Sequence, residues 1–532
     1  MRAWIAVSVA ALSLAVIGCG KGSISSRGSA EASNMLRYPI PTKPTSLDPA
    51  VVQDGDTIDL LQQVYEGLLK WGEDNRPAPN LAEKWEISED GTEYTFHIKK
   101  GVKFSNGREM TAEDFKWSID RACTGTFPRE MADSYLGEIV GAKDVIQNKA
   151  KSVSGITTPD PYTVKIKIDK RRPYFLNKLT FPVSFVVAKE SAPAVDEITK
   201  VEQMIGTGPF IAKSYDPNQV FTLVANKNYH GGAPKIEGIV RKIILDPQTR
   251  LNEFKSGQQD LVALERQDVE GLKKDAKFAS QLHFYDRPAI WYVGLNVKEY
   301  PPFADVRVRR AFAMAINRDR IVNELLGGLV KKADCILPPG VLGHRDNTKM
   351  VEYNPAEAKK LLAEAGYPDG KGLPPLEIKF RDGRADIRTV AEAIQNDLKA
   401  NLGISIGLKN KEWRAYLEEN NAKKIPFFHM RWAADYLDPQ NFLSLMLATT
   451  GEQNKTNWSN PEFDRLCAAA DVEADEPKRL KMYADAEDIV LREIPWIPVY
   501  FQRDAELISP RVAGMRESLF GHLPHTTVTL TP

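Results

Sequence analysis

Apolar and polar residues alternate in two stretches of the first third of the chain. Residues 93–99 (EYTFHIK) place three apolar side chains between polar ones, and residues 162–169 (YTVKIKID) do the same. A period of two is typical of a strand with one buried face. The pattern therefore predicts two half-buried strands.

Two further stretches carry helix signals. Residues 111–122 (TAEDFKWSIDRA) begin with Thr111, a favourable N-cap, followed by acidic residues in the first turn. Residues 354–370 (NPAEAKKLLAEAGYPDG) begin with an Asn-Pro pair, and Gly366 follows the last apolar position. Because both kinds of pattern occur along one chain, the sequence predicts a mixed α/β fold.

The first twenty residues, MRAWIAVSVAALSLAVIGCG, follow a different pattern. A basic start at Arg2 precedes an apolar run to Ile17 and small residues before Cys19. This run has the length of a signal-peptide core and is short for a bilayer span. Its ending resembles the lipobox of bacterial lipoproteins, so we expect residues 1–18 to be a removed signal peptide and Cys19 to carry lipid. An ordinary signal peptide with a chance cysteine is the alternative.

Residues 19–34 are small and polar, and they predict a flexible tether. Two or more acyl chains anchor a protein stably, so we expect a location in the cell envelope, periplasmic or otherwise outside the cytoplasm, with lipid anchoring to a membrane. No later stretch approaches 18 uninterrupted apolar residues, so no other span is expected. Cys123, Cys335 and Cys467 have no CxxC spacing, and their state cannot be inferred.

Length and charge limit the possible partners. A chain of 532 residues is too long for one core, which predicts two or three domains. Lys+Arg and Asp+Glu both number 71. Because there is no basic excess, we expect no nucleic-acid partner, and a neutral or zwitterionic partner fits better.

One acidic residue lies in unusually apolar surroundings. Residues 427–439 (FFHMRWAADYLDP) set Asp435 among aromatic and aliphatic side chains. A buried carboxylate costs several kcal/mol unless a cation meets it. The stretch contains no Lys, and its one Arg, Arg431, need not point the same way. The cation that Asp435 holds must therefore be sought elsewhere.

Residues 80–122 have the sequence NLAEKWEISEDGTEYTFHIKKGVKFSNGREMTAEDFKWSIDRA. This stretch resembles the signature region of the solute-binding proteins of peptide ABC transporters, the oligopeptide- and dipeptide-binding family. The resemblance extends nearly over the whole mature chain. The other matching blocks follow in order: SLDP (46–49), YEGL (65–68), GTGPF (206–210), PPFADVRVRRAFAMAINRDRIV (301–322), NPAEAKKLLAEAGY (354–367), NKEWRAYL (410–417), RWAADYLDP (431–439) and NWSNPEFDRL (457–466).

The resemblance implies an α/β, periplasmic-binding-protein-like fold with two lobes, an extra inserted domain and a hinged ligand cleft. It places lobe I at residues 35–65, 190–288 and 503–532, the inserted domain at 66–189 and lobe II at 289–502. It also implies a monomer that captures short peptides and delivers them to membrane permease subunits with cytoplasmic ATPases. No cofactor and no metal site are expected.

The resemblance also implies a set of ligand contacts. Asp435 matches the family's acceptor for the peptide α-amino group, so the missing cation would arrive with the ligand. Trp413 and Trp432 match tryptophans that line side-chain pockets, although both are candidates for ordinary core residues. Tyr436 adjoins Asp435 and is a candidate to support it by a hydrogen bond. A purely structural alternative makes Asp435 a cap for the turn before Pro439, a role that Asp438 suits better.

Several positions depart from the family pattern. Asp54 is a weaker candidate for an acidic contact near the peptide amine, because the alignment slips by one residue there. Asn420 and His429 stand where some relatives have arginines for the peptide carboxylate, which puts peptide length in doubt. His429 could serve if protonated, and a structural histidine is the alternative. A pocket Tyr is replaced by Ala132, and a disulfide of some members by Ala289 and Ala433.

An enzyme is not expected. Residues 403–407 (GISIG) satisfy G-x-S-x-G, but the Ile404/Ile406 alternation predicts a strand rather than a nucleophile elbow. HExxH, a zinc-like Cys/His cluster and a P-loop are missing from the sequence. A carrier of a metal chelate, haem or another non-peptide solute remains an alternative, because a fold does not fix its ligand. A lipoprotein with chaperone or adhesion duties is a third.

Overall fold

The computed structural model describes residues 34–531 except 194, 383–384 and 452. The predicted signal peptide (1–18), the predicted lipid attachment at Cys19 and the predicted tether up to residue 33 lie outside the described residues. Asn34–Thr531 form one compact unit. Within this described part, no helix has the length and apolarity that a bilayer crossing requires.

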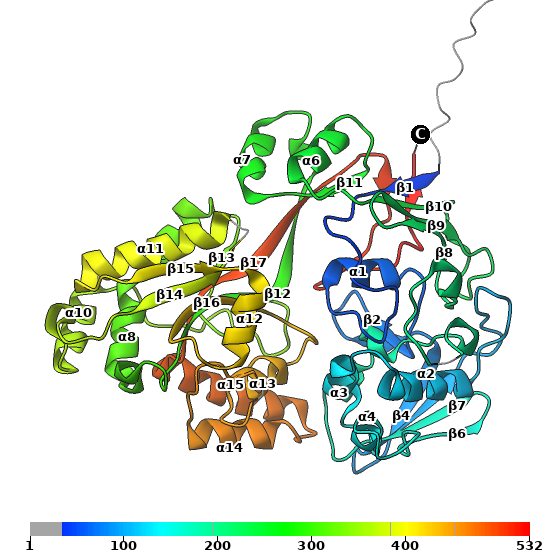
Figure 1. The fold of residues 1–532 in the computed structure, drawn as a ribbon, viewed down its shortest axis with the longest axis horizontal. Helices are drawn as coiled ribbons and strands as arrows, with labels where there is room; N and C mark the ends of the chain where they lie inside the picture. The colour runs from blue at the N-terminus through cyan, green and yellow to red at the C-terminus, as the bar shows by residue number, and fades with distance from the viewer. Residues whose placement is uncertain (1–33, 194, 383–384, 452, 532) are drawn as a thin grey trace, which may run out of the picture. The chain divides into compact units, whose positions relative to one another are not determined.

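The largest sheet is built around two long antiparallel strands, β12 (Leu282–Leu295) and β17 (Trp496–Ile508), which Figure 1 shows in green and red. The first half of β12 is partly exposed, whereas residues 288–295 are all buried. The strand order is β11-β17-β12-β16-β14-β15, with β13 paired to β17. The remaining strands are β11 (Leu261–Ala263), β13 (Lys331–Lys332), β14 (Glu377–Arg381), β15 (Gly407–Lys411) and β16 (Phe427–Ala433).

Helices cover this sheet. α11 (Ala385–Leu402) packs on β14 and β15, and α8 (Val306–Ala315) and α10 (Pro355–Glu364) pack beside it. The helix predicted for the Asn354 segment is confirmed, because Asn354 accepts the Glu357 backbone N–H at 3.1 Å and Gly366 follows with a positive φ. The buried residues of these elements belong to one core that also takes in the later half of β12 and the first half of β17.

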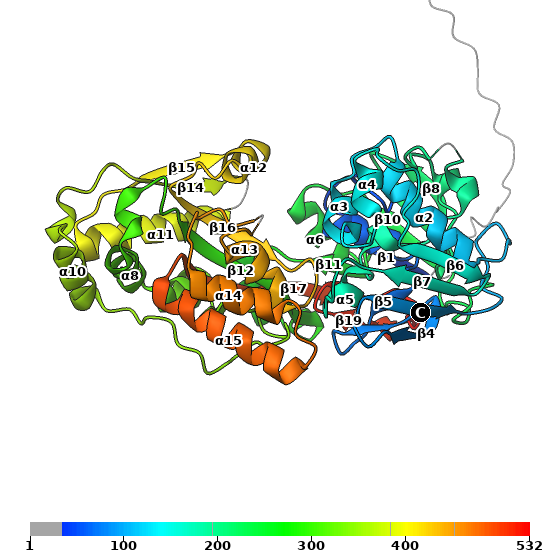
Figure 2. The ribbon, with the colours of Figure 1, turned by 90° about the horizontal axis from the view of Figure 1, so that it is seen from below.

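A second sheet contains both predicted strands of the first third. β5 (Glu93–Ile98) and β7 (Thr163–Lys167) are antiparallel neighbours in the order β4-β5-β7-β6. β4 (Ala82–Ile87) and β6 (Ile156–Asp160) complete the sheet. α2 (Ala112–Thr124) packs on β6 and β7 (Figure 2), and Thr111 forms a capping box with Asp114 at its start. The predicted helix and strands are thus confirmed, and they enclose their own core.

A third sheet has the order β1-β10-β9-β8, in which β1 (Met35–Arg37) runs parallel to β10 (Gly238–Lys242). Its other strands are β8 (Phe210–Asp216) and β9 (Val220–Ala225). The core of this sheet draws on residues between Leu36 and Leu261 and on Ile508 and Val528 near the end of the described chain. Separate cores therefore accompany the sheets, and the domain boundaries given above stay a prediction.

The remaining helices range from the three residues of α9 to the 18 residues of α15. The helices are α1 (Gly55–Leu61), α3 (Glu130–Leu136), α4 (Ala142–Ile146), α5 (Phe175–Lys178), α6 (Pro247–Lys255), α7 (Arg266–Lys274), α9 (Arg318–Arg320), α12 (Trp413–Asn421), α13 (Ser444–Leu447), α14 (Pro461–Ala470) and α15 (Glu476–Glu493). Short pairs are β2 (Leu69–Trp71) with β3 (Pro77–Pro79), β18 (Val512–Ala513) with β21 (Thr529–Leu530), and β19 (Glu517–Ser518) with β20 (Gly521–His522).

The strand predicted for residues 403–407 is wrong. Gly403 ends α11 with a φ of 72° and donates its N–H to the Lys399 carbonyl oxygen at 3.1 Å, and β15 begins only at Gly407. Ile404 and Ile406 are nevertheless buried. Residues 403–406 thus form a connection between α11 and β15. Their alternating isoleucines are buried, but these residues do not form the backbone hydrogen bonds of a sheet. Cys123, Cys335 and Cys467 are buried free thiols.

Candidate ligand-binding site

Strand β16 (Phe427–Ala433) forms the first half of the stretch 427–439 that contains Asp435. It pairs antiparallel with β12, and Ala433 lies directly opposite Ala289. These are the two positions at which the resemblance implies a disulfide in some members. Their direct pairing supports the alignment through this motif, and it places Asp435 just beyond the end of β16.

Asp435 is half-buried and is held by one amide side chain. Its backbone N–H donates to Oδ1 of Asn441 at 3.1 Å, and Nδ2 of Asn441 donates to its Oδ2 at 3.4 Å. The indole Nε1 of Trp432 also donates to Asn441, at 3.0 Å to its carbonyl oxygen. Asn441 therefore fixes the acid and the tryptophan relative to each other.

In the part of the chain that the structure describes, no cation lies close enough to form an ion pair with this carboxylate. Among the described residues, no Lys, Arg or His nitrogen lies within 4.0 Å of it. Burial raises the pKa of Asp435 from 3.8 to about 6, although hydrogen bonds from Asn441 and the Tyr135 hydroxyl and the more distant charge of Lys178 oppose the rise. The Lys178 ammonium is itself engaged, because it donates to Oε1 of Glu138 at 3.0 Å. The Asp435 carboxylate can therefore form an ion pair with a positively charged group of a ligand.

Aromatic side chains surround the acid. The Tyr436 ring stacks on Tyr174 with centroids 5.8 Å apart, and the Lys178 ammonium lies 5.6 Å from the Tyr436 ring. The Tyr436 hydroxyl donates to Oε1 of Gln440. Tyr436 therefore contributes an apolar face beside Asp435, while its hydroxyl is directed to Gln440.

Asp438, three residues further on, is in the opposite situation. Both of its carboxylate oxygens accept from Arg479, at 2.8 and 2.6 Å, and both side chains are buried. Asp438 also accepts the Gln440 backbone N–H at 3.0 Å. The expected turn cap before Pro439 is therefore Asp438.

Residues 76–454 match the family described as bacterial extracellular solute-binding proteins, family 5, middle region. The chain belongs to this family. A dipeptide-binding protein, DppE of Bacillus subtilis, is 28% identical over 533 residues, which cover 96% of each chain. Heme-binding protein A of Haemophilus influenzae is 30% identical over 549 residues, which cover 98% of each chain.

A solved structure extends the likeness to the fold. The unliganded open form of the periplasmic murein tripeptide-binding protein MppA superposes with a TM-score of 0.79 at 27% identity. The match covers 94% of this chain and 98% of that chain. The expected periplasmic-binding-protein-like fold is therefore confirmed.

Trp413 opens α12 of this solute-binding protein and is half-buried. The Arg381 guanidinium lies 4.4 Å from the centre of its indole ring, and Tyr416 stacks behind it at 6.0 Å. A half-buried indole held by such contacts is suited to serve as a wall for an apolar side chain.

His429 lies on β16 and is only 1% exposed. Burial lowers its pKa to about 4, and the Trp291 ring is 5.3 Å away. Neither ring nitrogen has a hydrogen-bond partner in the described part of the chain. Because the imidazole is uncharged at neutral pH, this environment favours the structural alternative over recognition of a carboxylate.

Asp54 is the N-cap of α1. Its Oδ1 accepts the Thr57 backbone N–H at 2.9 Å, and its Oδ2 accepts from the Thr45 hydroxyl. A capping aspartate of this kind stabilises a helix by about 0.5–2 kcal/mol. The structure thus gives Asp54 a local structural role as a helix cap, and its contact near the peptide amine stays a prediction.

Three residues around Asp435 were missed from the sequence. Asn441, Tyr135 and Lys178 come from the short segment after Pro439, from α3 and from α5. Asn441 lies six residues after Asp435, so its proximity was a usable signal. Tyr135 and Lys178 are separated from Asp435 by more than 250 positions, and no local pattern could have identified them.

In the described residues one group has the composition of a metal site, namely Glu506, Glu517 and His522. The two imidazole nitrogens meet different carboxylates, Nε2 to Glu506 at 2.9 Å and Nδ1 to Glu517 at 2.7 Å. The two carboxylates raise the pKa of His522 to about 10 against the effect of burial. An imidazolium held between two acids accounts for this group.

Proposed function

We propose that this solute-binding protein captures short peptides and holds their free amino terminus at Asp435. The observation that carries the proposal is the half-buried carboxylate of Asp435. Asn441 holds it by a hydrogen bond, and no cationic side chain of the described residues forms an ion pair with it. A free α-amino group has a pKa of about 8 and is mostly protonated at neutral pH. This ammonium group would be the counter-ion of the Asp435 carboxylate.

The environment makes this contact strong. An ammonium–carboxylate pair in a desolvated site is worth much more than the same pair in water. Removal of one partner of a buried pair typically costs about 3–5 kcal/mol, which corresponds to about two to three decades in affinity. Trp413, Trp432 and Tyr436 supply apolar walls, so side-chain selectivity is broad while the amino terminus is required.

Delivery follows from family membership. We propose that lobe I (35–65, 190–288 and 503–532) and lobe II (289–502) close on the peptide, and that the loaded monomer presents it to the permease of an ABC importer. Lipid on Cys19 would keep the protein at the outer side of the cytoplasmic membrane or in the periplasm. The protein performs no catalysis in this role.

Titration calorimetry tests the role of Asp435. Peptides with free amino termini are compared with the same peptides after N-acetylation, against the native chain and Asp435→Ala. We expect acetylation and the substitution each to weaken binding on the order of 100- to 1000-fold, with little further loss when they are combined. Equal affinity for acetylated and free peptides would mean that the amine is held elsewhere.

A non-peptide solute is the second candidate, because the Haemophilus relative at 30% identity is a heme-binding protein. A buried, uncharged His429 without a hydrogen-bond partner in the described chain is chemically able to act as a metal ligand. Haem titration followed by visible absorption distinguishes the two. A Soret shift that disappears in His429→Ala and persists in Asp435→Ala would favour haem over peptide.

A further inference from the structure

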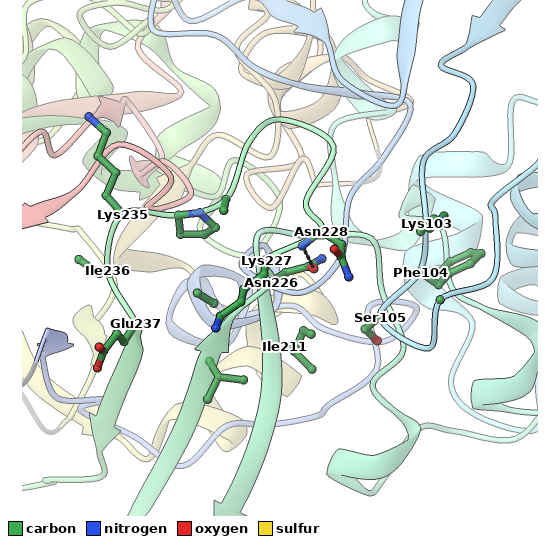
Figure 3. Close-up of a pocket in the computed structure, with 15 residues that line it drawn as sticks. Lys103, Phe104, Ser105, Ile211, Asn226, Lys227, Asn228, Lys235, Ile236 and Glu237 are labelled. Atoms are coloured by element: carbon green, nitrogen blue, oxygen red, sulfur yellow. Dashed lines mark hydrogen bonds between the residues drawn. The ribbon is translucent and has the colours of Figure 1, made fainter.

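A cavity lies beside strands β8 and β9 of the β1-β10-β9-β8 sheet. This cavity has a volume of about 830 Å³, and none of the residues that surround Asp435 lines it. Figure 3 shows its walls, with Lys103, Phe104 and Ser105 on one side, Lys235, Ile236 and Glu237 on the other, and Asn226 to Asn228 between them. Such a cavity is large enough for a small ligand or a lipid headgroup.

The lining combines an apolar floor with a cationic rim. Ile211 and Val224 are cross-strand partners on β8 and β9, and Ile236 and Phe104 are buried beside the opening. Lys103, Lys227 and Lys235 are exposed, and Glu237 is the acidic residue of the lining. In the described chain no carboxylate oxygen lies within 4.0 Å of any of these three ammonium groups. The lining therefore favours an anionic occupant with an apolar part.

The cavity also adjoins the point at which the described chain begins. Nδ2 of Asn34 donates to the Lys235 carbonyl oxygen at 3.1 Å, and the Glu237 N–H donates to the Asn34 carbonyl oxygen at 2.7 Å. Asn34 lies fifteen positions after Cys19, a distance in sequence that spans about 50 Å at most when the chain is fully extended. The wall of the cavity is thus hydrogen-bonded to Asn34, the first described residue after the segment that leads to the proposed lipid.

We propose that this cavity binds the phosphate headgroup of an anionic phospholipid in the membrane to which Cys19 is attached. The argument from proximity rests on the lipid attachment proposed above. The three ammonium groups suit a phosphodiester as point charges, and the apolar floor suits the glycerol and the first methylenes. Because the anchor limits how far the cavity can move away from lipid, it raises the occupancy of the cavity above that of the same site without an anchor. Binding there orients the protein on the bilayer.

Vesicle binding by the chain from Gly20 to Pro532 tests the proposal, because this chain keeps the compact unit Asn34–Thr531 and lacks the leader and Cys19. Vesicles of phosphatidylcholine alone are compared with vesicles that also contain phosphatidylglycerol. The cavity variant is Lys103→Gln/Lys227→Gln/Lys235→Gln. The matched control is Lys274→Gln/Lys349→Gln/Lys360→Gln, which removes the same charge from exposed lysines outside the cavity.

We expect binding that depends on phosphatidylglycerol, a loss on the order of 100-fold in the cavity variant at about fivefold per lysine, and little loss in the control. Equal losses in both variants would overturn the proposal in favour of general charge attraction. Displacement by millimolar inorganic phosphate would assign the cavity to a free anion. If the chain does not bind vesicles, the proposal is overturned. If the cavity variant, and not the control, then also reduces peptide uptake, the cavity is assigned to an acidic protein segment.

These outcomes are separable from failure of the proposed function. The vesicle experiment contains no peptide, and Asp435→Ala is expected to bind vesicles as the native chain does. Lipid on Cys19 is tested independently by mass spectrometry of the protein extracted from membranes.

Discussion

Asp435 and Asp438 stand three residues apart in one motif, yet their surroundings differ completely. Asp438 has both oxygens on the guanidinium of Arg479 and is buried. Asp435 has an amide and a tyrosine hydroxyl as partners and keeps a raised pKa of about 6. One acid is neutralised within the protein, whereas the other is left without a counter-ion in the described chain.

The difference separates a structural acid from a binding acid. Arg479 lies on α15, 41 positions after Asp438, and it also donates to the Ala470 carbonyl oxygen at 3.1 Å. Such a pair fixes the position of the motif but leaves no charge for a ligand. The unpaired acid costs folding free energy in the empty protein, and a cationic ligand recovers this energy on binding.

The largest effect is expected when the paired acid loses its cation. Arg479→Met leaves Asp438 buried without a counter-ion, so the free energy of unfolding falls by about 3–5 kcal/mol, measured by urea denaturation. The double variant Asp438→Asn/Arg479→Met recovers most of this loss because the buried charge is gone. Arg414→Met, which breaks an exposed pair with Glu418, is the matched control and changes stability by less than about 0.5 kcal/mol. A loss of that small size in Arg479→Met would contradict the comparison.

The unpaired acid is expected to respond with the opposite sign. Asp435→Asn removes a charge that the empty protein disfavours, so the ligand-free protein becomes more stable at about pH 7.5. The rise in pKa from 3.8 to about 6 corresponds to at most about 3 kcal/mol, and partial exposure reduces the expected gain to about 1–3 kcal/mol. Urea denaturation without peptide measures it.

The pH dependence of this gain gives a further check. Because the folded pKa of Asp435 lies above the unfolded value, its contribution to stability is complete below about pH 3.8 and is lost as the pH rises through about 6. The stability difference between Asp435→Asn and the native chain therefore grows over this range and is constant above it. A native chain that is the more stable of the two at about pH 7.5 would show that Asp435 has an internal counter-ion.

Local elements were predictable because local rules decide them. The capping box of Thr111 and Asp114 and the alternation in β5 involve residues that lie close together in sequence. The resemblance further aligned Ala289 with Ala433, which are direct partners in the sheet. Such features need no knowledge of tertiary contacts.

The electrostatic environment of each acid could not be derived in this way. Asp54 caps a helix, and Asp435 faces Tyr135 from a distant helix, yet both were plausible amine acceptors in the sequence. Burial of His429, which lowers its pKa, depends on how β16 packs beside Trp291. Charge states follow from desolvation by distant segments, which no short motif encodes.

Peptide binding is expected to titrate with Asp435. Affinity is constant at about pH 6.5–7.5 and falls by up to about tenfold per pH unit below about 6, as the empty site takes up a proton. It falls again above about pH 8, where the peptide amine loses its proton. Calorimetry across this range measures both limbs, and an N-acetylated peptide, which lacks the amine, shows neither. Unchanged affinity down to about pH 4.5 would rule out a carboxylate with a raised pKa as the partner of the amine.

The smallest predicted effect concerns Tyr135, whose hydroxyl lowers the pKa of Asp435. A hydrogen bond of this kind is worth about 0.5–1.5 kcal/mol, so Tyr135→Phe moves the acid limb of peptide binding to higher pH by about 0.5–1 unit. Tyr174→Phe is the matched control, because its hydroxyl contacts Arg172 and Glu138 instead. In this control the pH at which peptide affinity begins to fall on the acid side is unchanged, even if the free energy of unfolding decreases. An equal shift in both variants would mean that general loosening of the aromatic wall, rather than a hydrogen bond to the acid, controls the protonation of Asp435.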